Sequence, residues 1–154
     1  MDLEQLRTFL IEANKNTYST GNESLNKKET DKSTTISYKK GEWRFHDNFF
    51  GGEPYGGREV VFYRESPVWI MVYYGSIDKK IVPESVYPTL QKALWSMPDE
   101  YPFRGPTEIQ DGEYTYRNHW IGTLEEFKGE EIILKENIEI YKASYGGGLV
   151  DQKR

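Results

Sequence analysis

Two glutamates stand at matching places in the chain and are the first residues whose types suggest chemistry. Glu59 precedes Val60-Val61 and Glu131 precedes Ile132-Ile133, so each glutamate begins a similar apolar run. If both side chains face inward, the carboxyl groups approach each other and the pKa of one rises, as a general acid requires. If they face outward, they are ordinary solvated strand residues. The sequence leaves both interpretations open.

Arg104 is the second candidate, in the run Tyr101-Pro102-Phe103-Arg104-Gly105-Pro106 after the second predicted helix, at the junction between the repeated strand regions. Its planar guanidinium can bind a carboxylate or a phosphate through two parallel hydrogen bonds. Ligand sites often form where elements meet, which favours a binding role for Arg104. The alternative is a rigid turn in which Arg104 caps helix carbonyls or pairs with Glu100.

The glycine-rich segment 51–57 (Gly-Gly-Glu-Pro-Tyr-Gly-Gly) allows backbone N–H groups to approach a ligand closely. A phosphate-binding loop should open a helix, however, whereas strands are predicted on both sides of this segment. A β-connection with unusual dihedral angles is therefore the alternative. Glu53 and Tyr55 are the members we expect to contact a ligand.

The chain contains 12 Tyr, 7 Phe and 4 Trp, and several of these rings could line a concave, wet surface for a flat ligand. Packing in the core is the alternative for most of them. The candidates for ligand contact among these aromatic residues are Trp69, Tyr73, Tyr114 and Tyr145.

Metal and cofactor chemistry find little support in the sequence. There is no cysteine, which excludes thiolate catalysis and cysteine-ligated metals. The two histidines are His46, followed by Asp47-Asn48, and His119. Neither has carboxylates at the close spacing typical of a metal site, so we expect both at strand edges or on the surface rather than as metal ligands. We expect no metal and no cofactor, and we assign no catalytic residue.

These candidates must be positioned by elements that occur twice. Gly41-Glu42-Trp43-Arg44-Phe45 returns 71 positions later as Gly112-Glu113-Tyr114-Thr115-Tyr116. From Tyr55 onward the offset is 72, so that Trp69, Tyr73 and Gly75 match Tyr141, Tyr145 and Gly147. A repeat of this length is one supersecondary unit that buries its apolar face against its twin.

The predicted fold is α+β, with one domain over 1–154 and halves of about 1–78 and 79–148. Each half contains one helix and four antiparallel strands, related by a pseudo-two-fold axis. A helix follows Asp2, and a second runs from Pro83 to about Met97, with Pro88 favouring a start nearer Tyr87. The polar segment 20–34 predicts a mobile loop, and the tail from Gly146 predicts a loose end.

Charge and hydropathy restrict the partners. The net charge is −5, and an acidic protein binds the negatively charged phosphates of nucleic acid poorly. No apolar run approaches the 18 residues that span a membrane, and the N-terminus lacks the pattern of a signal peptide. We therefore expect a cytoplasmic protein with a small molecule or a protein as partner and no contact with membrane. The oligomeric state is not predicted.

Several motifs together resemble an uncharacterised bacterial domain of unknown function that occurs alone or behind a Cro/repressor-type helix-turn-helix. They are Phe49-Phe50-Gly51-Gly52-Glu53, Pro67-Val68-Trp69, Tyr73-Tyr74-Gly75, Arg104-Gly105-Pro106 and 111–116 (Asp-Gly-Glu-Tyr-Thr-Tyr), and the resemblance covers nearly the whole chain. It implies a sensor or effector-binding role and supplies no catalytic residue. This chain lacks the helix-turn-helix, so DNA binding does not carry over. Bacterial effector-binding domains of the gyrase-inhibitor type are similar at the level of the fold alone.

Three functions follow from these observations. The leading hypothesis is a small-molecule (effector) binding module with its site at the seam between the repeats and Arg104 in that site. The alternative is a protein-interaction domain, an adaptor or inhibitor that uses an exposed apolar face. An acid/base enzyme would require two carboxyl groups that converge in a pocket with perturbed pKa values, from candidates such as Glu53, Glu59 and Glu131.

Overall fold

The computed structural model describes residues 1–151, and its elements have the following bounds. Two α-helices span Leu3–Lys15 (α1) and Tyr87–Trp95 (α2), and the short 3-10 helices η1, η2 and η3 span Tyr18–Thr20, Glu23–Leu25 and Pro83–Ser85. The strands are β1 (Lys27–Lys28), β2 (Thr34–Lys40), β3 (Trp43–Phe50), β4 (Tyr55–Tyr63), β5 (Ser66–Ile77), β6 (Glu108–Asp111), β7 (Tyr114–Thr123), β8 (Glu126–Lys135) and β9 (Ile138–Leu149).

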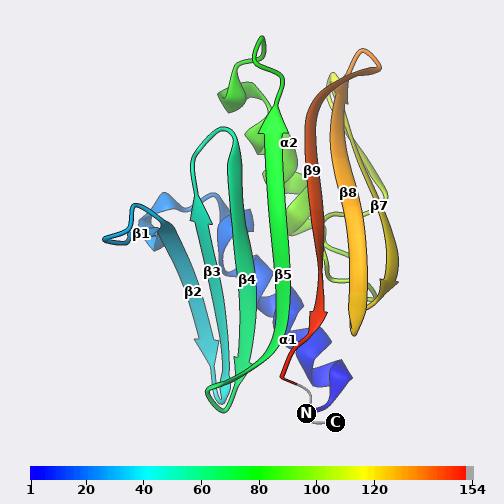
Figure 1. Cartoon of the computed structure of the whole chain (residues 1–154). Helices are drawn as coiled ribbons and strands as arrows, with labels where there is room; N and C mark the ends of the chain where they lie inside the picture. The colour runs from blue at the N-terminus through cyan, green and yellow to red at the C-terminus, as the bar shows by residue number, and fades with distance from the viewer. Residues whose placement is uncertain (152–154) are drawn as a thin grey trace.

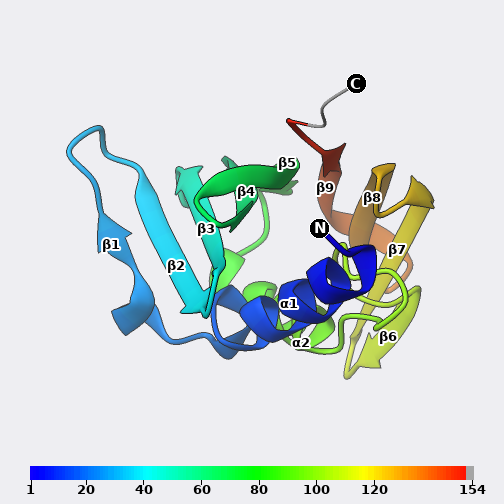
Figure 2. The same cartoon turned by 90° about the horizontal axis from the view of Figure 1, so that it is seen from below.

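All nine strands of the described chain join one antiparallel sheet in the order β1-β2-β3-β4-β5-β9-β8-β7-β6 (Figure 1). The first half thus reaches the middle of the sheet with β5, and the last strand, β9, pairs with it there. Seen from below, the sheet curves around the two helices, which cover its concave face (Figure 2). The predicted α+β class with antiparallel strands is confirmed. No helix within 1–151 is both long and apolar enough to cross a membrane.

Helix α1 begins where the sequence predicts it. The Asp2 side chain accepts a hydrogen bond from the backbone N–H of Glu4 at 3.1 Å, which satisfies one of the free donors of the first turn. The Phe9 ring stacks on Trp43 of β3 with 5.4 Å between ring centroids. The buried face of α1 follows the expected helical spacing and consists of Leu6, Phe9, Leu10 and Ala13.

Helix α2 is shorter than a helix from Pro83 would be. Pro83 begins the separate 3-10 turn η3, and α2 starts at Tyr87 with Pro88 in its first turn. A proline is tolerated there because its missing N–H would have no partner within the helix. The buried face of α2 consists of Thr89, Leu90, Ala93 and Leu94.

Strand β9 corrects the prediction of a loose tail. The strand continues through Gly146, Gly147 and Gly148 to Leu149 and pairs there with β5 and β8. A Cβ atom on Gly147 would collide with the carbonyl oxygen of Ile70, so the glycine permits a close approach of the two central strands. The last part of the predicted tail, residues 152–154, lies outside the described residues.

The polar segment 20–34 holds more hydrogen-bonded structure than its composition predicts. Asn22 caps η2 by accepting from the backbone N–H of Ser24, and β1 pairs with β2 at the edge of the sheet. Asp31 accepts hydrogen bonds from the backbone and the hydroxyl of Ser33 at 3.0 and 2.6 Å. Short polar side chains that bond to nearby backbone thus replace an apolar core in this segment.

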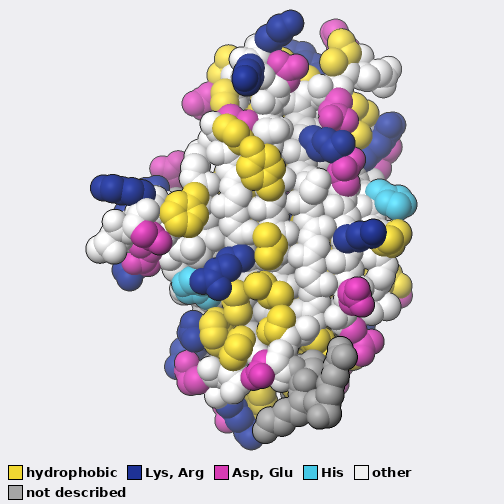
Figure 3. Space-filling view, viewed as in Figure 1, with side chains coloured by type: hydrophobic (Ala, Val, Ile, Leu, Met, Phe, Trp, Pro, Cys, Tyr) yellow, Lys and Arg dark blue, Asp and Glu magenta, His cyan; other side chains and the backbone are white. Residues whose placement is uncertain are grey.

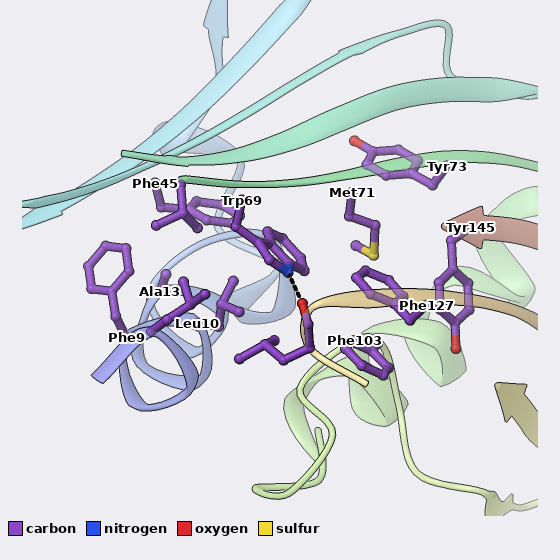
Figure 4. Packing of buried hydrophobic residues seen from close by; sticks show 13 residues of the cluster. Phe9, Leu10, Ala13, Phe45, Trp69, Met71, Tyr73, Phe103, Phe127 and Tyr145 are labelled. Atoms are coloured by element: carbon purple, nitrogen blue, oxygen red, sulfur yellow. Dashed lines mark hydrogen bonds between the residues drawn. The ribbon is translucent and has the colours of Figure 1, made fainter. Parts of the chain in front are cut away.

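Aromatic rings dominate the core between α1 and the middle of the sheet (Figure 4). Phe127 of β8 stacks on Phe103 at 3.9 Å and on Trp69 at 5.5 Å between centroids. The indole N–H of Trp69 donates to the carbonyl oxygen of Leu124 at 3.1 Å, drawn as the dashed line in Figure 4. Burial of such rings supplies the apolar area that the modest aliphatic content does not.

The convex face of the sheet points away from the helices and carries apolar side chains over β4 and β5 (Figure 3). Val72 and Tyr74 of β5 are 54% and 60% exposed, whereas Met71 and Tyr73 between and beside them are buried. The alternation follows from the period of two along a strand. It gives β5 one face toward the helices and one apolar face toward solvent.

Candidate functional site

A cavity of about 500 Å³ lies between the concave face of the sheet and the helices. Its walls come from the inward faces of β2 to β5, from η1 and α2, and from the segment that carries Phe103 and Arg104. Small-molecule sites typically measure about 300–1,000 Å³. Well-packed protein interiors contain few voids larger than a water molecule. The cavity therefore has the size of a ligand site rather than of a packing defect.

Two carboxyl groups stand side by side on one wall of this cavity. Asp47 of β3 and Glu59 of β4 are direct partners in the antiparallel register, so both side chains lie on the concave face. Directly opposed residues have Cβ atoms about 4.5–5.5 Å apart. Tyr73 of β5 donates its hydroxyl proton to Oδ1 of Asp47 at 2.5 Å. Neither carboxyl oxygen of Glu59 accepts a hydrogen bond from a residue within 1–151.

Burial raises the pKa of both carboxyl groups, because the ionised form loses its hydration. Burial raises the pKa of Asp47 from 3.8 to about 6, against the lowering effects of the Tyr73 hydroxyl and the charge of Arg104. Burial also raises the pKa of Glu59 from 4.5 to about 8, and the negative charge of Asp47 adds to that rise. At neutral pH the pair therefore carries about one negative charge, with the proton held on Glu59.

Arg104 lines the cavity and forms a buried ion pair with Glu131 of β8. Nε of Arg104 donates to Oε1 of Glu131 at 3.1 Å, and Nη2 donates to the same oxygen. The hydroxyls of Tyr116 and Tyr141 donate to Glu131 at 2.6 and 2.9 Å. Glu131 is thus fully buried but fully supplied with donors, as a buried charge must be. Its partner is Arg104, and the sequence alternative of a pair with Glu100 is wrong.

Aromatic side chains form much of the remaining wall. Tyr55 and Tyr73 face the cavity from β4 and β5, and their ring centroids are 6.0 Å apart. The Tyr55 hydroxyl shares a hydrogen bond of 2.5 Å with the hydroxyl of Tyr141. Burial raises the pKa of the Tyr55 and Tyr18 phenols, so both remain neutral donors at physiological pH. The aromatic residues that line the cavity are Tyr18, Phe49, Tyr55, Tyr73, Tyr87 and Phe103.

Three of the predicted site residues meet in this cavity, namely Arg104, Tyr55 and Tyr73. Glu53 lies beside it and is engaged elsewhere. Its carboxylate accepts from the backbone N–H of Ile77 and from the hydroxyl of Tyr87 at 2.7 Å, so it fastens the glycine-rich loop to α2 and to the end of β5. The loop itself connects two strands, as the β-connection alternative holds, while Gly51 and Gly52 border the cavity.

The other three predicted residues lie outside the cavity wall. Trp69 is fully buried in the aromatic core. Tyr145 is buried and donates its hydroxyl to Asn118 at 2.7 Å. Tyr114 packs at the margin of a separate buried cluster that includes Leu90, Tyr116 and Tyr141, and the Lys135 ammonium lies 5.8 Å from the centroid of its ring. Tyr73 and Phe103, by contrast, belong to the aromatic core and also line the cavity.

The sequence analysis considered Asp47 only beside His46, where a metal site finds little support, and missed its place beside Glu59. The available signal was parity: Asp47 shares a strand face with Phe45, which an apolar core must bury. Tyr18 was not singled out either, because it follows α1 in a short 3-10 turn without periodicity. Within 1–151 no group of three or more His, Asp or Glu side chains is arranged to hold a metal ion.

A family model described as domain of unknown function (DUF5680) matches residues 47–150, about two thirds of the chain. No curated protein and no solved structure was found to match the chain. The matched range begins at Asp47 and includes Glu59, Tyr73, Arg104 and Glu131, so it holds the carboxyl pair and the buried ion pair described above, whereas Tyr18 precedes it. The chain therefore belongs to the DUF5680 family of domains of unknown function.

Proposed function

We propose that this protein is a small-molecule (effector) binding module and that the cavity between sheet and helices is its site. The observation that carries the proposal is an inward-facing pair of carboxyl groups, Asp47 and Glu59, in a cavity of about 500 Å³. Buried polar groups are costly unless they find partners, and a core that served packing alone would place apolar side chains here. A bound ligand supplies such partners.

The position of the cavity supports a site between two related halves. Its strands belong to residues 1–78, whereas α2 and Arg104 belong to 79–148. We infer that the halves are a duplication, and the central register supports this. Trp69 pairs with Leu149 and Ile77 pairs with Tyr141, which is the reciprocal pairing expected when Trp69 and Tyr141 are equivalent. The hydroxyl bonds Tyr73 to Asp47 and Tyr145 to Asn118 are also equivalent.

A thermal-shift screen against a library of metabolites at about 1 mM tests the proposal. A ligand at 100 times its dissociation constant stabilises the folded state by about 2.7 kcal/mol, which raises the midpoint by several degrees in a domain of this size. Gln91→Trp places a ring in the cavity from α2, where Gln91 is half-buried, and should abolish the shift. Lys15→Trp makes the same residue at an exposed position of α1 and should not.

A hit that shifts the wild type and Lys15→Trp, but not Gln91→Trp, supports the proposal. Hits that are equally strong in Gln91→Trp place binding outside the cavity and contradict it. A screen without any hit favours a protein partner instead, which the exposed apolar side chains of the convex face would serve.

Acid/base catalysis is the second candidate function, and the same pair of carboxyl groups favours it. Asp47 and Glu59 have pKa values of about 6 and 8, so one is ionised and the other protonated at neutral pH. This is the pattern of a general base beside a general acid. Incubation of each screen hit with the protein, followed by mass spectrometry, should then reveal a product. Asp47→Asn should form no product, even at hit concentrations high enough to saturate the variant.

A further inference from the structure

The two matching glutamates of the sequence have the same orientation but different surroundings. Glu59 and Glu131 both face the concave side, each beside a residue of the neighbouring strand, Asp47 or Asn118. Glu131 receives hydrogen bonds from Arg104, Tyr116 and Tyr141, whereas Glu59 receives none from any residue of 1–151. The contrast shows what a carboxyl group at this position needs.

The missing donors have a simple cause in the sequence. At the offsets of the repeat pattern, Tyr116 corresponds to Phe45 and Tyr141 corresponds to Trp69. Phenylalanine has no hydroxyl, and the indole N–H of Trp69 is already donated to the carbonyl oxygen of Leu124. Glu59 therefore sits in an arrangement built for a carboxylate, without the side chains that complete it.

The carboxyl group of Glu59 faces the cavity instead of donors from the described chain. Glu59 lines the cavity, and its carboxyl oxygens, unpartnered within 1–151, are accessible from it rather than sealed in the protein interior. Oδ2 of Asp47 likewise has no hydrogen-bond donor in the described chain, although Asp47 is only 5% exposed. The hydroxyl of Tyr18, another lining residue, has no partner within 1–151 either. Three polar groups from three elements thus face one cavity.

The charge of the wall selects between ligand classes. Glu131 neutralises Arg104 and takes the hydrogen bonds of its Nε and Nη2, so the guanidinium is poorly placed to hold an anion. Asp47 and Glu59 feel the charge of Arg104 but form no ion pair in the described chain, and Glu23 and Glu84 add acidic groups at the rim. The faces of Tyr55, Tyr73 and the other lining rings attract cations as well.

We infer that the cavity binds a small organic cation whose protonated amine donates hydrogen bonds to Glu59 and Asp47 while its apolar part packs on the aromatic wall. This inference rests on the proposed function and names its ligand class. It replaces the carboxylate or phosphate that Arg104 alone would suggest from the sequence.

Cation binding should be linked to the protonation of Glu59. The titratable and charged groups that surround it are Asp47 (β3), Tyr55 (β4), Tyr73 (β5), Arg104, Glu131 (β8), Tyr18 (η1) and Tyr87 (α2), with Glu23 and Glu84 at the rim. With its pKa near 8, free Glu59 is mostly protonated at pH 7, and a bound cation favours the ionised form. Binding at pH 7 should therefore release a proton and strengthen as the pH rises.

Isothermal titration with matched probes tests the inference. The probes are phenethylamine, tryptamine and hexylamine, each with the alcohol and the carboxylate of the same skeleton. We expect at least one amine to bind at least tenfold more tightly than its alcohol and its carboxylate. Its affinity should increase about tenfold from pH 6.5 to 8.5, and titrations in two buffers of different ionisation enthalpy should show release of up to about one proton.

Two variants assign the effect to the carboxyl pair. Glu59→Gln should weaken binding of the amine about 10- to 100-fold and remove the pH dependence, because a hydrogen bond to a charged group is lost. Glu139→Gln, at an exposed position of β9, should leave both unchanged. Asp47→Asn should weaken the amine by a similar factor.

The outcomes separate this inference from the function on which it rests. The assignment of a cationic ligand is wrong if carboxylates or alcohols bind as well as the amines, or if Glu59→Gln does not weaken amine binding. Either result still leaves a small-molecule site in place. Absence of amine binding alongside cavity-dependent hits in the metabolite screen overturns the cation alone. Absence of both removes the proposed function together with it.

Discussion

Glu59→Gln should stabilise the protein, and increasingly so as the pH rises. In the unfolded chain a glutamate loses its proton near pH 4.5, whereas folded Glu59 keeps its proton until about pH 8. Between these values folding takes up a proton, so the free energy of unfolding falls with rising pH by about 1.4 kcal/mol per unit. Glutamine cannot ionise, and the variant escapes this loss.

The magnitude follows from the two pKa values. A shift of the Glu59 pKa from 4.5 to about 8 lowers the free energy of unfolding by less than about 1 kcal/mol at pH 5, by about 3 kcal/mol at pH 7 and by about 5 kcal/mol at pH 9. Water that reaches the cavity screens the ionised group and reduces the effect. We therefore expect Glu59→Gln to gain about 1–3 kcal/mol at pH 9 relative to its gain at pH 5.

Urea unfolding followed by the fluorescence of the 4 Trp residues measures this gain at pH 5, 7 and 9. Glu139→Gln, whose carboxylate is exposed, is the control and should unfold like the wild type at each pH. A Glu59→Gln gain that is the same at pH 5 and pH 9, or a loss of stability at pH 9, would refute the reasoning. Either result would mean that Glu59 is solvated or holds a donor in the folded state.

Three further predictions concern the groups around Glu59. Arg104→Ala should lower the free energy of unfolding, measured with urea, by about 3–5 kcal/mol, since it leaves a buried glutamate unpaired. An arginine that was free to bind ligand would instead lose ligand affinity without a loss of stability. A decrease in the free energy of unfolding below about 1 kcal/mol would contradict the ion pair. Tyr73→Phe should raise the pKa of Asp47 further, because the lost hydrogen bond favours the ionised form; NMR titration of the Asp47 carboxyl carbon checks the direction, and an unchanged or lower pKa contradicts it. Gly57→Ala should cost about 1–3 kcal/mol, because its Cβ would lie 2.6 Å from the backbone carbonyl oxygen of Asn48 and 2.7 Å from the Tyr73 hydroxyl oxygen. Gly52→Ala, whose Cβ meets nothing within 4 Å, is the matched control and should be close to neutral in the same assay.

Local signals in the sequence were sufficient for most of the elements but not for all. Asp2 and the apolar spacing of α1 determine a helix that needs no tertiary information to recognise. The same local view failed at Gly147, because three consecutive glycines read as a flexible end. In the fold that glycine is required by the carbonyl of Ile70 across the sheet, and such a constraint exists only once β5 and β9 are paired.

The candidate site was harder to predict because its members come from separate strands. Glu59 and Arg104 could be singled out by residue type and position, but their partners could not. Asp47 meets Glu59 through the β3–β4 register, and Arg104 meets Glu131 across 27 residues. Register depends on loop geometry and on which faces are buried, and one residue of slip would turn Asp47 to the convex face.

The repeat pattern itself concealed the feature that matters for function. A comparison by residue class pairs Phe45 with Tyr116 and Trp69 with Tyr141 and counts each as a match between aromatic residues. For packing the match is fair, since all four rings are buried. For Glu59 and Glu131 it is not, since Tyr116 and Tyr141 each donate a hydroxyl hydrogen bond and their counterparts donate none to Glu59.

The difference between the two glutamates also carries a stability cost, and that cost argues for a role. Glu131 shows that this fold can hold a carboxylate at such a position with every acceptor supplied. At Glu59 the fold instead keeps a carboxyl group with a raised pKa, where glutamine or an apolar residue would be more stable at neutral pH. Destabilising polar groups of this kind are found where activity or binding requires them. The expected gain in stability and loss of amine binding in Glu59→Gln are therefore two consequences of one arrangement, and observing the first without the second would leave the carboxyl pair without a ligand to explain it.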